Sequence, residues 1–349
     1  MVVAPGTLDQ LPQRLGTFAP RGRVWIVSDD EVWPLHGERL TSILAGAGTA
    51  ARDFQIPAGE PSKNLDIVRS VYDWLLQSGV ERGDMLLAFG GGVVGDLAGF
   101  AAATVLRGIA FVQLPTTVLA MVDSSIGGKT GVDHPVGKNL IGSFYQPRLV
   151  LADTSLLHTL PEAERQAGWT EAIKHGMIAD ADLLADLAAN AAALRAVDEP
   201  ATSDLIRRAA AVKVAIVSGD EREQGQRILL NYGHTVGHAL ERWSNYTIRH
   251  GEAVAIGMCV AAAIARRVGL CNAELEGRQL SILRDFGLPV RLPGEAEPAA
   301  ILDAARSDKK IRQQRLNWVL PTAIGAATVR NDVPDSTVLE TLGELRREH

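Results

Sequence analysis

The chain contains very little cysteine. Only two of its 349 residues are cysteines, Cys259 and Cys271, and neither belongs to a CxxC pair. Two cysteines cannot hold a chain of this length together through disulfides. The composition is typical of a protein from a reducing compartment.

The sequence also lacks a long apolar run and an excess of positive charge. Residues 108–122 and 253–265 are among the longest uncharged stretches, and both are shorter than the ~20 residues of a membrane span. The opening MVVAPGTLDQLPQRL shows no basic segment followed by an apolar one, as a signal peptide would. The net charge of −6 argues against non-specific binding to nucleic acid or to a membrane surface. We therefore expect a cytoplasmic protein without nucleic-acid or membrane partners.

Apolar residues, in contrast, are abundant. Hydrophobic residues make up 46% of the chain and charged residues 22%, which is typical of a globular protein with a large core. At roughly 150 residues per domain, the length favours two domains.

The first part of the chain alternates between two hydrophobic periods. Strands are expected at 23–28, 85–89, 109–114 and 148–153. Helices are expected between them at 35–44, 62–77 and 94–106, with Ser62 as the N-cap of the second. This alternation predicts an α/β domain over residues 1–153, with a mostly parallel sheet covered on both faces.

Beyond residue 153 the pattern becomes helical. Alanine- and leucine-rich segments with helical spacing occupy 161–178, 181–196, 202–218, 234–243, 251–268 and 273–286. Only 317–320 and 326–329 have the character of strands. Residues 154–349 are therefore expected to form a mainly α-helical domain.

A glycine-rich segment, GGGVVG at 90–95, lies between an expected strand and an expected helix. Glycines at such a place let backbone N–H groups approach a phosphate at the helix N-terminus. However, the segment does not follow the first strand, and no acidic residue occurs at 110–117, about 20 residues further on. Spacing alone leaves two interpretations open, a tight strand-to-helix turn and a phosphate loop of non-standard layout.

A second glycine-rich segment, VDSSIGGKTG at 122–131, contains Lys129 and is followed by Lys138 and Asn139. It is not a P-loop, because the required first glycine is replaced by Asp123. Lysines on glycine-rich loops suit anionic oxygens, but solvated surface lysines would give the same pattern.

Histidines and one glutamate suggest a metal site. His234 and His238 are four residues apart and would share one face of a helix. His250 opens another expected helix, and Glu171 lies within a third. Two or three histidines with one carboxylate are typical of a catalytic divalent metal site, although each histidine alone could be a hydrogen-bonded core residue. The HxxxH spacing without a glutamate is not that of a metalloprotease.

Together these segments resemble the 3-dehydroquinate synthase family, in one order from about residue 25 to residue 333. The matching blocks are GGGVVGDLAGF at 90–100, LRG at 106–108, PTT at 115–117, VDSSIGGKTG at 122–131, GKNLIG at 137–142, FYQP at 144–147, NYGH at 231–234, HGEAV at 250–254 and DKK at 308–310. The resemblance implies a Rossmann-like NAD-binding domain, a helical metal- and substrate-binding domain, and an active site between them. It also implies two cofactors, NAD and one divalent metal ion, zinc or cobalt.

The resemblance assigns roles to individual residues. It gives the metal to Glu171, His234 and His250, which places His238 beside the substrate instead. The residues that it implies for NAD are Glu60, Lys63, Gly92, Val93, Val94, Gly95, Asp96, Thr116, Thr117, Lys129, Lys138, Leu156 and Thr159. The substrate-side or catalytic residues that it implies are Asp123, Lys129, Asn139, Lys174, Lys213, Arg227, Asn231, His238 and Lys309, with Lys310 as the alternative to Lys309. Arg107 resembles the arginine that reaches a neighbouring subunit's phosphate site, which implies a homodimer.

Two residues depart from the family pattern. Glu31 stands where some members carry asparagine beside the cofactor, and His158 stands where many bacterial members carry lysine. The adenosine contacts near Glu31 are therefore in doubt, and the NAD contact at His158 is expected to be weaker.

The implied reaction converts 3-deoxy-D-arabino-heptulosonate 7-phosphate into 3-dehydroquinate and phosphate, in the shikimate pathway to aromatic amino acids. It proceeds by NAD-dependent oxidation, phosphate elimination, reduction by the same NADH and an intramolecular aldol closure. Three alternatives remain at this stage: a related sugar-phosphate cyclase, a metal-dependent alcohol or polyol dehydrogenase, and a non-catalytic nucleotide-binding protein of the same fold.

Overall fold

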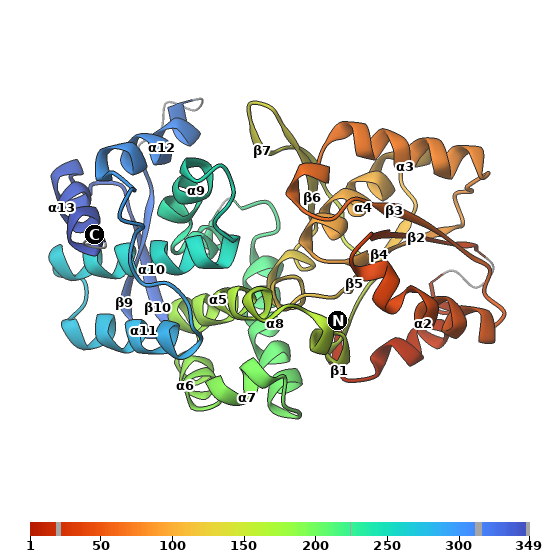
Figure 1. Ribbon diagram of the computed structural model, residues 1–349, viewed down its shortest axis with the longest axis horizontal. Coiled ribbons are helices and arrows are strands. Elements are labelled where there is room, and N and C mark those ends of the chain that lie inside the picture. Colours follow the sequence, from red (N-terminus) through yellow and green to blue (C-terminus); the bar gives the residue numbers. More distant parts are fainter. Residues whose placement is uncertain (19–21, 224, 311–315, 347–349) are drawn as a thin grey trace. The chain divides into compact units, whose positions relative to one another are not determined.

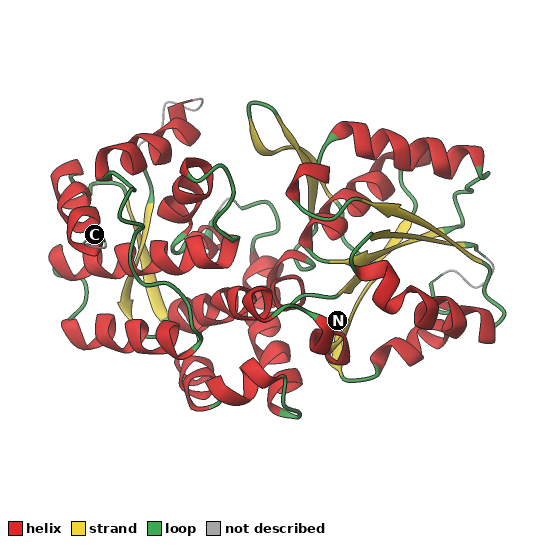
Figure 2. Cartoon of the chain, viewed as in Figure 1, coloured by secondary structure: helices red, strands yellow, loops and turns green. Residues whose placement is uncertain are grey.

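The computed structural model describes residues 1–18, 22–223, 225–310 and 316–346, apart from the side chains of 307–310. These residues form two compact units, Met1–Pro161 and Glu162–His349. The division falls after Pro161, later than the change of sequence pattern at residue 153. Figure 2 distinguishes the helices and strands by colour.

The first unit is built around a sheet of six strands (Figure 1). The strand order is β1-β8-β5-β4-β2-β3, and all five pairings are parallel. The mostly parallel α/β sheet predicted from the sequence is thereby confirmed. The strands are β1 (Val2–Ala4), β2 (Val24–Asp29), β3 (Ala51–Ile56), β4 (Met85–Gly90), β5 (Ala110–Pro115) and β8 (Leu149–Asp153).

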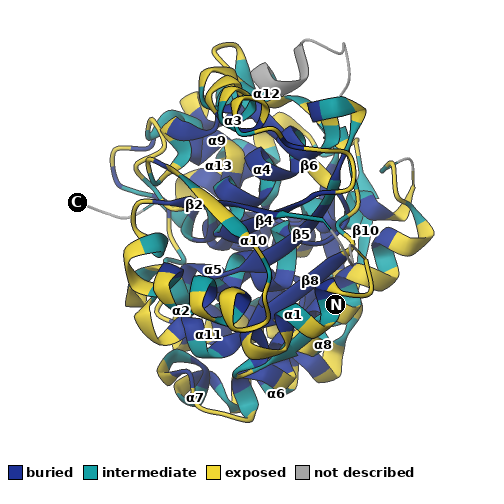
Figure 3. Ribbon diagram, turned by 90° about the vertical axis from the view of Figure 1, so that its right-hand side faces the viewer, coloured by how far each residue is buried: buried dark blue, intermediate teal, exposed yellow. Residues whose placement is uncertain are grey.

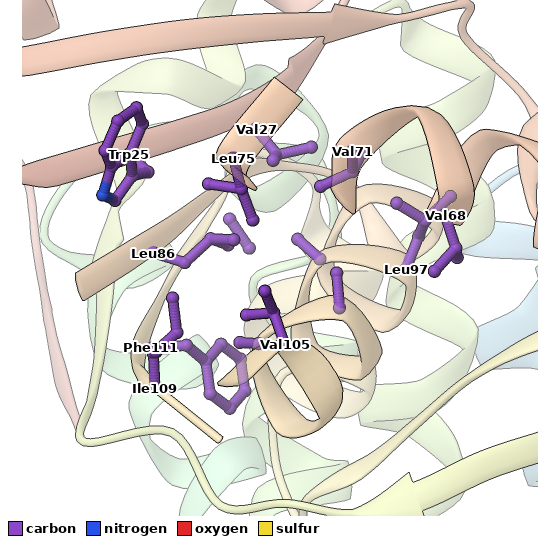
Figure 4. Close-up of a cluster of buried hydrophobic side chains, with 14 of the residues drawn as sticks. Trp25, Val27, Val68, Val71, Leu75, Leu86, Leu97, Val105, Ile109 and Phe111 are labelled. Atoms are coloured by element: carbon purple, nitrogen blue, oxygen red, sulfur yellow. The ribbon is translucent and has the colours of Figure 1, made fainter. Parts of the chain in front are cut away.

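Helices cover both faces of this sheet. Because successive side chains of a strand point to opposite faces, Ile26 of β2 packs in a cluster with side chains of α1 and α2. Its neighbour Trp25 packs in a second cluster with α3 and α4 (Figure 4). Strands β2, β4 and β8 are buried along their whole length (Figure 3). The helices and single turns of this unit are η1 (Thr7–Gln10), α1 (Leu11–Leu15), α2 (Val32–Gly46), η2 (Glu60–Ser62), α3 (Leu65–Gln77), α4 (Gly92–Thr104), η3 (Val105–Arg107), η4 (Ala120–Ser124) and η5 (Thr154–Thr159).

The first residues of the chain are tied to strand β8. β1 pairs with Leu151–Asp153, and the Asp153 carboxylate accepts the N–H groups of Gly6 at 2.7 Å and Leu8 at 3.0 Å. Asp153 is fully buried, so these hydrogen bonds offset the cost of removing its charge from water. A three-residue strand is too short to show a hydrophobic period, and the sequence therefore did not predict β1.

The strand order creates a switch point between β2 and β4. The chain passes from β2 outward to β3 and then returns to pair β4 with the other side of β2. In open α/β sheets, ligands bind at the carboxyl ends of the strands beside such a point. The glycine-rich turn at Gly90–Gly92 follows β4 and therefore lies there.

A two-stranded hairpin extends this unit. β6 (Lys129–His134) and β7 (Gly137–Phe144) pair antiparallel, and β6 packs against α4. The sequence suggested only a glycine-rich loop here, because the hairpin lacks a regular alternation of apolar and polar residues. Lys129, Lys138 and Asn139 are therefore held on strands.

The second unit is mainly helical, as predicted. Its elements are α5 (Glu162–Ala179), α6 (Ala181–Ala189), α7 (Ala191–Ala196), α8 (Ala201–Gly219), η6 (Gln226–Asn231), α9 (His234–Trp243), α10 (His250–Arg267), α11 (Ala273–Asp285), α12 (Pro298–Lys310), β9 (Trp318–Ala323), β10 (Ala326–Arg330) and α13 (Asp335–Leu345). α10 is buried along most of its length, because α5, α9, α11, α13 and β9 surround it. None of the helices in the described part of the chain combines the length and apolar character that a membrane span requires.

Two glycines bring the backbones of three helices of this unit into direct contact. A Cβ atom on Gly257 of α10 would overlap the carbonyl oxygen of Gly233, which is the N-cap of α9. A Cβ atom on Gly251 would overlap the carbonyl oxygen of Ala167 in α5. The separation of α10 from α9 and α5 is thus set by backbone atoms.

Local details differ from the sequence predictions. The N-cap of α3 is Asn64, whose side chain accepts the N–H of Ile67, whereas Ser62 lies in the preceding turn η2. The helix expected over 181–196 is divided at Asn190 into α6 and α7. Strand β3 and helices α12 and α13 were not predicted. β3 alternates poorly, since most of its side chains are partly or fully exposed at the sheet edge.

We expect Gly257→Ala to destabilise the second unit. The added methyl group would force α10 away from the start of α9, and overpacking of this kind costs about 1–3 kcal/mol. Gly277→Ala is the matched control, because nothing lies within 4 Å of its Cβ position in the middle of α11. The control should raise the free energy of unfolding by up to about 1 kcal/mol. Denaturant titration of both variants would show this, and equal midpoints would contradict it.

We expect the Asp84 carboxylate to stabilise the first unit at neutral pH. It accepts the N–H groups of Arg23 and Glu81 and the indole N–H of Trp25, each at 2.9 Å. Burial raises the pKa of Asp84, but these hydrogen bonds and the charge of Arg23 outweigh burial and lower it. Asp84→Asn should therefore cost about 1–3 kcal/mol at pH 7.

The sign of the pH dependence follows from the lowered pKa. The stabilisation is fully present above the unfolded value of about 3.9 and is lost as the pH falls through the folded value. The stability difference between the wild type and Asp84→Asn should shrink below about pH 4. Asp73→Asn, at an exposed position of α3, should show no such trend. A difference independent of pH would refute the role of the charge.

Candidate functional site

Three side chains of the second unit form a group that could hold a metal ion. Glu171, His234 and His250 each offer a ligand atom, and these atoms lie within 4.8 Å of one another. Nε2 of His234 lies 3.6 Å from Oε1 of Glu171, and Nε2 of His250 lies 3.4 Å from the same oxygen. Both histidines thus direct Nε2 toward one fully buried carboxylate.

Backbone geometry brings these three residues together. Gly233 caps α9 in the left-handed conformation at φ 80°, so the helix begins at His234. α10 begins at His250, behind a capping box of Arg249 and Glu252. Because the glycines of α10 hold it against the start of α9 and against α5, both first-turn histidines reach Glu171 in the middle of α5.

The two histidines differ in their electrostatics. Burial and the positive charge of Lys174 lower the pKa of His234 to about 3, so this ring is neutral at pH 7. Burial also lowers the pKa of His250, but its hydrogen bonds to Glu171 and Glu241 outweigh burial and raise it to about 10. A neutral imidazole is the form that binds a metal, and metal binding at this group would therefore compete with a proton on His250.

His238 lies beside the group on α9. Its ring centre is 5.2 Å from that of His234 and 6.2 Å from that of His250. The HxxxH spacing thus brings two rings together as expected. It does not by itself decide which ring binds a metal, because His238, Glu241 and His250 form a second group with ligand atoms within 4.8 Å.

Buried cations accompany these residues in the second unit. Lys174, Lys213 and Arg227 are all more than nine-tenths buried, which is rare for basic side chains. Lys174 lies one turn after Glu171 and forms an ion pair with Oε2 of that residue. Arg227 donates to the carbonyl oxygen of Glu221, and the Asn231 amide donates to Glu223 at 2.9 Å. Helix α8, which carries Lys213, packs against η6, which carries Arg227 and Asn231.

The glycine-rich turn of the first unit leads directly into α4. Gly91 is the extended N-cap, and no side chain caps the helix, so the first-turn N–H groups and the positive end of the helix dipole are presented at the switch point. Thr116 donates its N–H to the Gly90 carbonyl at 3.0 Å. A Cβ atom on Gly91 would lie 3.2 Å from Thr117. The segments expected to bind NAD, 92–96 and 116–117, are thus adjacent.

A charged network connects three further segments of this unit. Nζ of Lys63 lies 2.6 Å from Oδ2 of Asp96 and 2.6 Å from Oδ1 of Asn139, and Lys138 pairs with Glu60 at 2.9 Å. Burial lowers the pKa of Lys63, but the charges of Asp96 and Glu60 outweigh burial and raise it. Burial raises the pKa of Glu60, but Lys63 and Lys138 outweigh burial and lower it. Lys63 and Glu60 are therefore charged at neutral pH.

The remaining predicted residues are placed less distinctively. Asp123 is half-buried in η4, and Lys129 is exposed at the start of β6. Leu156 packs in the core, whereas the Thr159 hydroxyl contacts the His36 ring at 2.7 Å. Arg107 is exposed in the left-handed conformation at φ 68°. The side chains of Lys309 and Lys310 lie outside the described residues.

The two departures from the family pattern are both exposed. Glu31 lies at the start of α2, where its N–H donates to Asp29 at 3.1 Å. His158 lies in η5.

Two carboxylates near these groups were missed in the sequence. Oε2 of Glu241 lies 3.4 Å from Nδ1 of His250, and Asp133 accepts the N–H of Asn139 at 2.8 Å. Glu241 could have been found, because His238 follows His234 by four residues and Glu241 follows His238 by three, which places all three on one helix face. Asp133 carries no comparable signal, because the hairpin was not predicted.

Comparisons with known proteins agree with this arrangement. Residues 53–167 match the family model for the 3-dehydroquinate synthase N-terminal domain, and residues 168–311 match that for the C-terminal domain. A 3-dehydroquinate synthase from Nostoc punctiforme is 46% identical over 345 residues, covering 98% of this chain and 95% of the relative. One from Ruegeria sp. is 45% identical over 350 residues, covering 99% and 94%.

Solved structures include close matches. The 2-epi-5-epi-valiolone synthase ValA from Streptomyces hygroscopicus, with NAD+ and Zn2+ bound, has a TM-score of 0.91 at 32% identity and covers 99% of this chain and 95% of its own. A 2-deoxy-scyllo-inosose synthase complexed with carbaglucose-6-phosphate, NAD+ and Co2+ has a TM-score of 0.88 at 27% identity, covering 97% and 95%. A probable glycerol dehydrogenase from Sinorhizobium meliloti, at 17% identity and a TM-score of 0.68, shares the fold.

The family models together span residues 53–311, and the curated relatives align over almost the whole chain. The chain therefore belongs to the 3-dehydroquinate synthase family.

Proposed function

We propose that the chain is a 3-dehydroquinate synthase, which converts 3-deoxy-D-arabino-heptulosonate 7-phosphate into 3-dehydroquinate and phosphate. The observation that carries the proposal is the convergence of Glu171, His234 and His250, in a chain 46% identical to a curated synthase. On this view the first unit binds NAD, and the second binds the metal ion and substrate groups.

The donor set suits a catalytic divalent ion. Two imidazole nitrogens and one carboxylate oxygen are ligands that zinc and cobalt accept, and three protein ligands leave a position open. Glu171 is fully buried, and a buried carboxylate is favourable only beside positive charge or strong donors. We assign the ion to Glu171, His234 and His250.

The first unit suits a dinucleotide. The uncapped N-terminus of α4 presents N–H groups at the switch point, where a pyrophosphate would be stabilised by the helix dipole. We assign NAD contacts to this turn and to the residues near it, namely Glu60, Lys63, Gly92, Val93, Val94, Gly95, Asp96, Thr116, Thr117, Lys129, Lys138, Leu156 and Thr159. When bound, NAD supplies reversible hydride transfer and the divalent ion supplies Lewis acidity at the hydroxyl that is oxidised.

The chain's own residues bind and orient the substrate. Arginine and lysine side chains hold carboxylate and phosphate oxygens through charge-assisted hydrogen bonds, and burial strengthens these contacts. We assign this role to Lys174, Lys213, Arg227 and Lys309 of the second unit and to Lys129 of the first. Asn231, Asp123 and Asn139 are assigned to hydrogen bonds with other polar groups of the substrate. His238, one helical turn from His234, is assigned to proton handling at the substrate.

Two further proposals concern assembly and location. Arg107 is exposed on a left-handed turn, and we propose that it binds the phosphate site of a second subunit in a homodimer. Both cysteines are free thiols, which supports a cytoplasmic enzyme.

A combined assay tests the function. The purified protein would be given the heptulosonate phosphate and NAD, with and without a chelator, while phosphate release and NADH absorbance are followed together. Metal-dependent phosphate release without net NADH is expected, because the reaction consumes no NAD overall. Steady accumulation of NADH would instead indicate a dehydrogenase.

A related sugar-phosphate cyclase is the second candidate. The observation that favours it is the TM-score of 0.91 to a valiolone synthase. The same assay, run with other sugar phosphates in place of the heptulosonate, separates the two. A preference for another sugar phosphate would overturn the first assignment and retain the fold, NAD and metal.

We expect Glu171→Ala to lose metal and turnover together. Removing the shared carboxylate should weaken zinc binding by more than about 100-fold, since even outer-shell changes cost 10–100-fold. Glu162→Gln, at an exposed position on the same helix, is the control and should bind zinc normally. Metal analysis after dialysis measures both. Full metal content in Glu171→Ala would contradict the proposed ligand set.

A further inference from the structure

In both histidines of the metal-binding group, the ring nitrogen Nδ1, which faces away from Glu171, lies close to an oxygen atom. Nδ1 of His234 lies 3.1 Å from the carbonyl oxygen of Tyr232, and its Nε2 lies 3.6 Å from Glu171. A carbonyl oxygen can only accept, so Nδ1 of His234 carries the proton and Nε2 keeps its lone pair. The backbone therefore fixes the tautomer of His234.

His250 has a side chain in the equivalent place. Its Nδ1 lies 3.4 Å from Oε2 of Glu241, and its Nε2 lies 3.4 Å from Oε1 of Glu171. The two nitrogens lie on opposite sides of the ring, so a single ion cannot take both. One carboxylate, Glu171 or Glu241, shares the metal with one nitrogen of His250. The other carboxylate then accepts the N–H of the second nitrogen.

Two observations favour Glu171 over Glu241 as the carboxylate that shares the metal with His250. Nε2 atoms of two histidines approach the same oxygen of Glu171, which also pairs with Lys174 through its other oxygen. Glu241, in contrast, faces the opposite nitrogen of His250, and its side chain is only 7% exposed. Glu241 thus faces Nδ1 of His250, as the Tyr232 carbonyl oxygen faces Nδ1 of His234.

We propose that Glu241 is a positioning residue for the metal site, which accepts the Nδ1–H of His250 and thereby presents Nε2 beside Glu171. This inference rests on the metal ligands of the proposed function. It assigns to a side chain on α9 the task of orienting a ligand on α10. A carboxylate acceptor also makes the ring a stronger donor to the metal.

Metal affinity, measured by competition with a chromophoric chelator for Zn2+ and for Co2+, tests the proposal without reference to activity. Glu241→Ala should lower the affinity for both ions by about 10–100-fold. Glu241→Gln retains an oxygen that can accept from Nδ1, and it should restore most of the affinity. Glu340→Gln, at an exposed position of α13, is the control and should match the wild type.

Thermal unfolding of the metal-free proteins separates positioning from a merely structural role. Glu241→Ala, which loses the acceptor, should bind metal more weakly, whereas Glu241→Gln, which keeps an acceptor oxygen, should bind it nearly as tightly as the wild type and be equally stable. Unchanged metal affinity in Glu241→Ala would overturn it. If Glu241→Ala lost as much metal affinity as Glu171→Ala and its Co2+ absorption spectrum changed, Glu241 would be a ligand, and the proposal would also be overturned.

The same experiment distinguishes this inference from the proposed function. If Glu171→Ala keeps its metal, the ligand set itself is wrong. If Glu171→Ala loses metal and Glu241→Ala does not, only the role of Glu241 fails.

Discussion

Direct contact between helix backbones is the constraint on which the metal-binding group depends. Gly257 and Gly251 let α10 approach the start of α9 and the middle of α5 without intervening side chains. With the helices this close, candidate ligand atoms from three helices lie within 4.8 Å of one another. The same contact buries Glu171 completely, and burial strengthens its interactions with His234, His250 and Lys174. The close approach of the helices therefore determines both the packing around Glu171 and the strength of its electrostatic interactions.

The candidate NAD site of the first unit depends instead on the strand order and on a charged network. The parallel sheet places the glycine-rich turn and Thr116 at adjacent strand ends because β4 and β5 pair directly. Lys63 then joins Asp96 at the start of α4 to Asn139 on the hairpin. An ion pair as buried as this one is favourable only if each charge keeps its partners. The network therefore also fixes the position of the hairpin against α4.

Much of this could be predicted from the sequence, and the failures have identifiable causes. Long apolar periods revealed β2, β4, β5, β8 and most helices, because burial on a fixed face leaves a repeating pattern. β1 and β3 were missed because one is very short and the other is largely exposed. The HxxxH spacing brought His234 and His238 to one face, but the proposed ligand set also needs Glu171 and His250, whose approach is set by tertiary packing. The spacing also places Glu241 on this face, but its partner His250 lies on another helix, so their contact could not be predicted.

The hydrogen bonds of Asp153 have a consequence for the order in which the chain can fold. Gly6 and Leu8 bind a side chain that is synthesised about 145 residues later, and β1 has no other strand to pair with in the sheet order. β1 can therefore pair only after β8 has left the ribosome. Contacts of such long sequence separation slow folding, because a long loop must close before they form. We therefore expect this edge of the sheet to close only after β8 is complete.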